Sequence, residues 1–291
     1  MKATRFRSAV VALGALSLVA TTSVMAGASA PSAKYNAKDA ALVPAAYKHI
    51  TLQVASDATY APDEFVKGTS LVGFDLDLMK AIGTTLGIKY TENNVTFDTI
   101  ITGMVANKYQ IGNSSFTDTK ARQKQVNFVD YFKAGEGVYV AKNSKMVFKG
   151  LTSFCGHTVA VETGTVEQTD AAAVKCPAGK KVAVSSYATQ TLANLALSAG
   201  HADFGFVDSQ IAGYIVATTG GRFKLSGSAV NVAPYGIATQ KNANGLALAK
   251  ALQAALKTLQ ASGVYKAILA KWGVQAGAVP ASQIVLNGAT S

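Results

Sequence analysis

Short apolar runs alternate with amphipathic segments along most of the chain. Runs with the apolar or alternating pattern of strands occupy residues 50–55, 88–91, 158–161 and 204–207. Between the first two runs, Leu78, Ile82 and Leu86 recur at a four-residue spacing, which predicts a helix that Gly87 ends. Strands that alternate with helices are typical of parallel sheets, so the pattern predicts an α/β fold.

The first 30 residues have the layout of a secretory signal peptide. Three cations in residues 1–7 precede an apolar stretch at 9–20 and small residues at 26–30. The apolar stretch is shorter than the ~20 residues that a membrane span needs. We expect cleavage after Ala26 or Ala28, so that residues 1–28 are removed and the protein is periplasmic; an uncleaved anchor is the alternative.

The net charge is positive because acids are scarce. The chain has 291 residues and a formal charge of +11, from 27 Lys and Arg against 16 Asp and Glu. The basic residues are scattered, with no run longer than Lys180-Lys181, and this argues against nucleic-acid binding. Lys2, Arg5 and Arg7 leave with the signal peptide, which lowers the charge from +11 to +8.

The chain has 2 cysteines, Cys155 and Cys176. This number excludes a four-cysteine zinc site and a disulfide-dense scaffold. Disulfides form and persist outside the cytoplasm, so we expect the two to pair in the exported protein. Two free buried thiols are the alternative.

Polar residues cluster after the predicted strands, where ligands bind in open α/β sheets. These residues are Asp57, Tyr60, Ser114, Ser115, Thr117, Gly164, Thr165 and Asp208, and Arg122 follows shortly after Thr117. Phosphate-binding, dinucleotide-binding and nucleophile-elbow motifs are absent from the sequence, and the 3 histidines are isolated. An exported receptor for a small ligand, without cofactor or metal, is therefore favoured over an enzyme.

Residues 73–82, which read GFDLDLMKAI, resemble the signature of family 3 solute-binding proteins. Members of that family are the periplasmic amino-acid receptors of ABC importers. Further segments that resemble the family follow in family order at residues 56–62, 115–122, 126–132, 164–165, 203–208, 234–237 and 263–273. Each segment is a weak signal alone, but the ordered set is specific and covers roughly residues 50–273.

The resemblance implies a type II periplasmic-binding-protein fold, in which two α/β lobes joined by two hinge strands close on the ligand. Carried over to this chain, lobe 1 comprises residues 50–140 plus 236–275, and lobe 2 comprises residues 141–235. Residues 29–49 are then a leader segment and residues 276–291 a loose tail. The implied partners are a free amino acid and the importer's membrane subunits, with the protein itself a monomer.

The resemblance also implies roles for polar residues that hold the amino-acid backbone of the ligand. Arg122 matches the position that pairs with the α-carboxylate, for which a planar guanidinium is suited. Ser115, Thr117 and Thr165 match positions that donate further hydrogen bonds. Asp208 matches the acid that accepts from the α-ammonium.

Three further positions define the walls of the implied pocket. Tyr60 and Phe97 match the aromatic residues that sandwich the ligand's side chain. Val166 departs from the family, because many members have a Thr there whose hydroxyl helps to hold the carboxylate. A valine offers only its backbone N–H, which puts the side-chain role at this position in doubt.

The resemblance places Asp57 and Glu162 beside the ligand's side chain, with Glu167 nearby. Two carboxylates in a closed site favour a cationic partner, since an unpaired buried charge is costly. We therefore predict arginine, lysine or ornithine as ligand, with glutamine or histidine second. A Glu162 that points to solvent is the alternative. An exported dehydratase of cyclic acids, with Glu162 as its acid, and a sensor domain are the competing functions.

Overall fold

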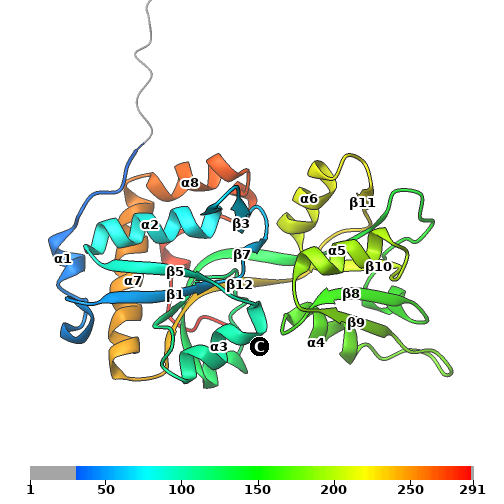
Figure 1. Ribbon diagram of the computed structural model, residues 1–291, viewed down its shortest axis with the longest axis horizontal. Coiled ribbons are helices and arrows are strands. Elements are labelled where there is room, and N and C mark those ends of the chain that lie inside the picture. The colour runs from blue at the N-terminus through cyan, green and yellow to red at the C-terminus, as the bar shows by residue number, and fades with distance from the viewer. Residues whose placement is uncertain (1–30, 290–291) are drawn as a thin grey trace, which may run out of the picture. The chain divides into compact units, whose positions relative to one another are not determined.

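Most strands of the described chain belong to one mixed sheet (Figure 1). The computed structural model describes residues 31–289, so the predicted signal peptide at 1–28 lies outside the described residues. Eight strands follow the order β5-β1-β6-β12-β7-β10-β8-β9, and β11 pairs with β7. The bounds of these strands are β1 Thr51–Ser56, β5 Lys89–Asn94, β6 Ile111–Gly112, β7 Val126–Ala141, β8 Thr158–Glu162, β9 Ala183–Tyr187, β10 Phe204–Asp208, β11 Phe223–Leu225 and β12 Val230–Gln240.

Two long strands connect the halves of this sheet. In the first half β1 runs parallel to β5 and β6, and in the second half β8 runs parallel to β9 and β10. β7 and β12 pair antiparallel with each other and extend from one half toward the other (Figure 1). From Glu136 onward β7 pairs with β10 and then with β11. Parallel strands with intervening helices confirm the predicted α/β architecture, while the borders drawn between the two lobes stay a prediction.

The first half buries a large core between the sheet and the helices α2 (Phe74–Leu86), α7 (Ala243–Ala261) and α8 (Val264–Trp272). Leu78, Ile82 and Leu86 are buried on α2, and Gly87 ends that helix in the left-handed conformation, as the sequence pattern predicts. A smaller core lies under α3 (Phe97–Val105). A separate three-stranded sheet is formed by β2 (Thr59–Tyr60), β3 (Glu64–Lys67) and β4 (Ser70–Val72).

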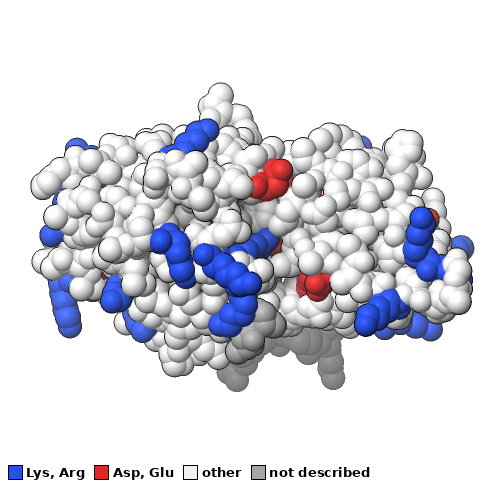
Figure 2. Space-filling model, turned by 90° about the horizontal axis from the view of Figure 1, so that it is seen from below, with Lys and Arg blue, Asp and Glu red and all other residues white. Residues whose placement is uncertain are grey.

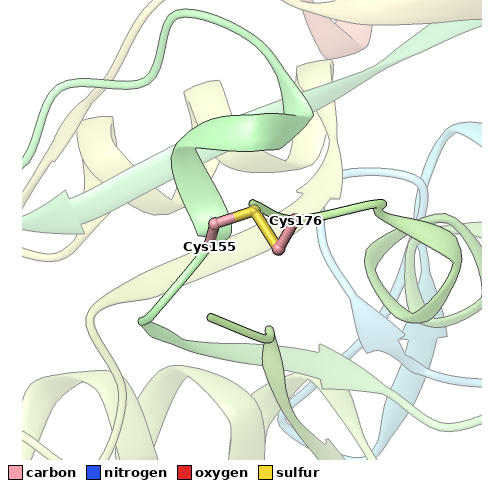
Figure 3. Close-up of a disulfide and its surroundings, with 2 residues drawn as sticks. All are labelled: Cys155 and Cys176. Atoms are coloured by element: carbon pink, nitrogen blue, oxygen red, sulfur yellow. A yellow bond between two sulfur atoms is a disulfide. The ribbon is translucent and has the colours of Figure 1, made fainter. Parts of the chain in front are cut away.

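The second half packs α4 (Val166–Ala173), α5 (Gln190–Ser198) and α6 (Ser209–Thr218) against its strands. A disulfide joins Cys155, which follows the short 3₁₀ helix Leu151–Phe154, to Cys176 beyond α4 (Figure 3). The predicted cysteine pairing is therefore confirmed. No helix among residues 31–289 has the length and apolar character that crossing a bilayer requires.

The segment before β1 packs on the first half. It contains α1 (Ala37–Ala40), and its Val43 and Tyr47 side chains are buried in the large core. Asp39 accepts a hydrogen bond of 2.6 Å from the Thr258 hydroxyl on α7. The described part of the predicted leader thus belongs to the folded body.

The predicted loose tail is wrong for residues 276–289. Ile284 is fully buried, and Leu286 forms an antiparallel bridge with Val129 of β7. The Ala289 N–H donates to Asp118 at 3.1 Å. These apolar and hydrogen-bonded contacts hold an Ala- and Gly-rich segment whose composition gives little sign of them.

Candidate ligand-binding site

A small cavity lies where the two halves of the described chain meet. It contains 11 of the 12 residues that the sequence nominated, Gly164 being the exception. The lining residues are Asp57, Tyr60, Glu64, Phe97, Ser114, Ser115, Thr117, Arg122, Glu162, Thr165, Val166, Glu167 and Asp208. Those from Asp57 to Arg122 come from the first half, and those from Glu162 to Asp208 come from the second half.

Arg122 connects the two halves at this cavity. Its Nη1 donates to the Thr117 carbonyl at 2.8 Å, and its Nη2 donates across the cleft to the Gly164 carbonyl at 2.9 Å. The guanidinium lies 5.3 Å from the centre of the Phe97 ring and 5.4 Å from that of Phe116, within the range of cation–π attraction. Since a guanidinium carries five N–H donors, several stay available to a carboxylate.

Gly164 does not line the cavity, but its backbone carbonyl accepts the hydrogen bond from Arg122. Its φ of 84° is in the left-handed region, and a Cβ there would lie 3.0 Å from the Cβ of Asp98 on α3. Glycine therefore permits the close approach of the two halves that brings the Gly164 carbonyl to Arg122.

Asp208 ends β10 and forms a second link between the halves. Its Oδ2 accepts a hydrogen bond of 2.6 Å from the Tyr60 hydroxyl. Burial raises the pKa of Asp208 to about 6, although hydrogen bonds from Tyr235 and Tyr60 and the charge of Arg122 act in the opposite direction. Tyr60 therefore contributes a polar contact to the site as well as the predicted aromatic wall.

Asp57 and Glu162 lie together at another part of the cavity. Asp57 is held by the Thr59 N–H at 3.0 Å, the Thr59 hydroxyl at 2.7 Å and the Phe97 N–H at 3.0 Å. Glu162 at the end of β8 is only 2% exposed, which overturns the alternative that it points to solvent. Burial, and then the charge of Asp57, raise the pKa of Glu162 well above its usual range.

The serine hydroxyls face acidic groups of the protein. Ser114 donates to Glu64 at 2.9 Å, and the Ser115 hydroxyl lies 3.1 Å from Asp63 and 3.2 Å from Glu64. Ser115 has a φ of 46°, an uncommon conformation for a residue other than glycine. The two serines thus hold buried carboxyl groups, and their role as donors to a ligand stays a prediction.

Thr165 begins α4 as its N-cap. Its hydroxyl accepts from the Gln168 N–H at 3.2 Å and donates to the Glu162 carbonyl at 2.8 Å. Val166 follows as the first residue of the helix and also lines the cavity. Because the first N–H groups of a helix lack partners within it, this turn can offer backbone donors where the Val166 side chain cannot.

Residues 52–275 match the family described as bacterial extracellular solute-binding proteins, family 3. The matched range includes every residue of the cavity lining. The chain belongs to this family. The resemblance seen in the ordered motifs is therefore confirmed over most of the chain.

Known relatives of this solute-binding protein support the fold and the class of function. The chain is 29% identical to the arginine-binding protein ArgT of Corynebacterium glutamicum over 78% of its own length and 75% of that protein. It is 30% identical to the histidine-binding periplasmic protein of Salmonella typhimurium, over 76% of this chain and 86% of that one. The solved structure of ArtJ from Geobacillus stearothermophilus, an arginine-, lysine-, histidine-binding protein, superposes with a TM-score of 0.70 at 26% identity, covering 77% of this chain and 95% of that chain.

Two further acids line the cavity of this solute-binding protein. Glu64 on β3 was not predicted as a site residue, although it follows the first ligand loop at residues 56–62 closely in the sequence. Glu167 lines the same cavity as Asp57 and Glu162, and its expected position near this pair stays a prediction. The charges that most affect its pKa are those of Asp208, Glu136 and Arg122.

The solute-binding site is acidic inside a basic protein. Five carboxyl residues and one arginine line the cavity, namely Asp57, Glu64, Glu162, Glu167, Asp208 and Arg122. On the face shown in Figure 2, Lys and Arg side chains are spread over the surface and most of the visible acidic atoms lie near its middle. The net charge of the chain is therefore a poor guide to the charge that its cavity prefers.

Proposed function

We propose that this extracytoplasmic solute-binding protein captures a basic amino acid between its two lobes and delivers it to the membrane subunits of an ABC importer. The observation that carries the ligand class is the acidic cavity, which is lined by five carboxyl residues and a single arginine. The names of the relatives, which bind arginine or histidine, support the same class.

The proposed ligand lies with its backbone groups at one end of the cavity and its side chain at the other. Arg122 pairs with the α-carboxylate, as a planar guanidinium can do with two parallel hydrogen bonds. Asp208 accepts from the α-ammonium. The side chain runs past Phe97 to the carboxyl groups of Asp57 and Glu162, which receive its cationic end.

The cationic end of the ligand fits beside Asp57 and Glu162 because the buried Glu162 carboxyl lacks a hydrogen-bond donor. One of its carboxyl oxygens, Oε1, is buried without a hydrogen-bond partner among the described residues. A buried carboxylate without a partner is costly, so Glu162 keeps a proton when no cation is present. A guanidinium or ammonium group replaces that proton and satisfies both carboxyl groups, whereas a neutral amide brings no charge to balance them.

Entry of the ligand requires the lobes to separate. In the described arrangement the cavity has room for about one water molecule, so an amino acid fits only when the lobes lie further apart than they do here. The two crossing strands β7 and β12 are the connections about which such a hinge motion would occur. The ligand shifts this equilibrium toward closure by binding the closed form more tightly than the open one.

Isothermal titration of the chain from residue 29 with each of the twenty amino acids and ornithine tests the proposal. We expect the tightest binding for arginine, lysine or ornithine. Arg122→Lys should abolish or strongly weaken binding of every ligand, since a lysine cannot form the paired hydrogen bonds of a guanidinium. Tight binding of glutamate without binding of arginine would overturn the proposal.

A matched variant separates the two ends of the cavity. Glu162→Gln keeps the size of the side chain and removes its charge, so it should weaken arginine binding while glutamine binding is retained or improved. Lys142→Gln on the surface of the second half is a control, and it should leave both affinities unchanged. Equal losses for arginine and glutamine in Glu162→Gln would contradict the assigned orientation.

A further inference from the structure

Glu167 is a buried acid of the cavity to which the proposed function assigns no role. It lies in the first turn of α4, is only 1% exposed and lines the cavity. Its Oε1 has no hydrogen-bond partner among residues 31–289. An unpartnered buried carboxyl oxygen is costly, so this side chain is an acceptor that lacks a donor in the described chain.

The surroundings of Glu167 identify the donor that would fit. Burial raises its pKa, and the carboxyl groups of Asp208 and Glu136 raise it further, while Arg122 lowers it. The hydrogen bonds of α4 point to the same end of the cavity, because Asn231 donates at 2.7 Å both to Asp170 of α4 and to Glu136, the residue of β7 that pairs with Asp208. Glu167 lines the cavity together with Asp208 and Arg122, the residues assigned to the ligand's backbone groups. A cation placed between Asp208 and Glu167 would relieve the repulsion between these acids and supply the missing donor.

Asp208 alone does not provide enough acceptors for an α-ammonium group. An ammonium has three N–H donors. The Oδ2 of Asp208 already accepts the Tyr60 hydroxyl at 2.6 Å, so part of this carboxylate is engaged by the protein itself. A second carboxylate at the same end completes the set of acceptors.

We propose that Glu167 is a second acceptor for the α-ammonium group of the ligand, beside Asp208, and that the pair selects ligands with a free primary amine. This inference rests on the proposed function, because it takes the ligand to be a basic amino acid whose amine lies at the Asp208 end. It assigns to Glu167 a part in specificity for the ligand's backbone, and not for its side chain.

Two ligands that differ only in the amine test the inference. L-Arginine and 5-guanidinopentanoate, which lacks the α-amino group, are titrated into the wild type, Glu167→Gln and Glu167→Asp. Glu167→Gln should weaken arginine binding by about 10-fold or more, the range for losing a hydrogen bond to a charged group. It should change binding of 5-guanidinopentanoate much less, and Glu167→Asp, which keeps the charge, should lie between the wild type and Glu167→Gln for arginine.

A control variant, and the outcomes that would contradict the inference, complete the test. Asp170→Asn makes the same change of charge on α4 outside the cavity lining and should leave arginine affinity unchanged. Equal weakening of both ligands by Glu167→Gln, or no weakening of either, would overturn the inference while arginine binding by the wild type upholds the proposed function. Failure of the wild type to bind arginine would overturn the proposed function, and the role of Glu167 with it.

Discussion

The Tyr60 hydroxyl donates a hydrogen bond of 2.6 Å to Asp208 across the cleft between the two halves. The Asp208 N–H in turn donates to the Tyr60 oxygen at 3.3 Å. The residue assigned to the ligand's ammonium group is therefore engaged by the opposite half. This contact stabilises the closed arrangement by satisfying buried polar groups that opening would return to water.

Replacing Tyr60 by phenylalanine should favour the open form of the ligand-free protein. The Tyr60→Phe variant keeps the ring but removes the hydrogen bond to a carboxylate, a contact of about 1.5–3 kcal/mol. We expect a larger radius of gyration in small-angle X-ray scattering without ligand. Tyr139→Phe is the matched control, because the Tyr139 hydroxyl bonds Asn194 within the second half. An unchanged radius in Tyr60→Phe would show that this contact does not hold the lobes together.

Binding of arginine should release protons. Burial and the facing Asp57 raise the pKa of Glu162 well above its usual range, so without ligand this carboxyl keeps its proton to a higher pH than an exposed glutamate does. A cationic side chain lowers that pKa and displaces the proton, and the neighbouring acids Glu167 and Asp208 add to the effect when the ammonium group binds. The affinity for arginine should therefore rise with pH above about 6, the pKa of Asp208, as the carboxyl groups of the cavity lose their protons.

Titrations in phosphate and in Tris measure this release, because the two buffers differ in ionisation enthalpy. The apparent binding enthalpy should differ between them in the wild type, and the difference should shrink in Glu162→Gln. Identical enthalpies in both buffers would mean that no proton leaves, and that the Asp57 and Glu162 pair does not receive the cation.

The sequence pattern predicted those structural features that residues close together in the chain determine. The four-residue spacing of Leu78, Ile82 and Leu86 identified α2, and Gly87 its end, because helix periodicity and capping are local. The residues after the strands were identified in the same way, since the carboxyl ends of parallel strands meet at one edge of a sheet. All the residues identified in this way except Gly164 line the cavity. Phe97, Glu162 and Val166, which also line it, were identified only through the resemblance to the family.

Contacts between distant segments were not predictable from these patterns. The hydrogen bonds by which Asn231 joins Asp170 of α4 to Glu136 of β7 connect residues 61 or more positions apart, and no spacing along the chain encodes them. The tail was predicted loose because of its Ala and Gly content, yet Ile284 and Leu286 are positioned by packing and pairing with strands about 150 residues earlier. In both cases tertiary packing decides the outcome that local composition cannot.

Removing the disulfide should lower stability without affecting binding. Cys155 and Cys176 are 21 residues apart, and closing a loop of this size is worth about 3 kcal/mol in the chain-entropy model. The bridge lies beyond the C-terminal end of α4, whereas the cavity residues Thr165 to Glu167 lie at its N-terminal end. A Cys155→Ala, Cys176→Ala double variant should therefore unfold at lower urea concentration and bind arginine as the wild type does.

Reduction provides the internal control for this prediction. Dithiothreitol should lower the urea midpoint of the wild type toward that of the double variant and leave the double variant unchanged. A wild-type midpoint that does not respond to the reductant, with the bond shown to be reduced, would contradict the stabilising role.

The ligand-free protein should lose stability as the pH rises from about 5 to about 8. Burial raises the pKa of Asp130 and of Glu136 to about 8 and that of Glu92 to about 7. Between the ordinary carboxyl range and these values, the folded state keeps protons that the unfolded state has released. Stability rises with pH only where the unfolded state binds more protons, so here it must fall.

Asp130 offers the clearest test of this pH dependence. After burial, the nearby charge of Asp118 is the next cause of its raised pKa. Asp130→Asn removes this titration and should flatten the fall of the thermal midpoint between about pH 5 and about pH 8, whereas Asp98→Asn on the exposed start of α3 should not. A midpoint that rises over this interval in the wild type, or an Asp130→Asn profile parallel to that of the wild type, would show that the buried carboxyl groups are ionised in the folded protein.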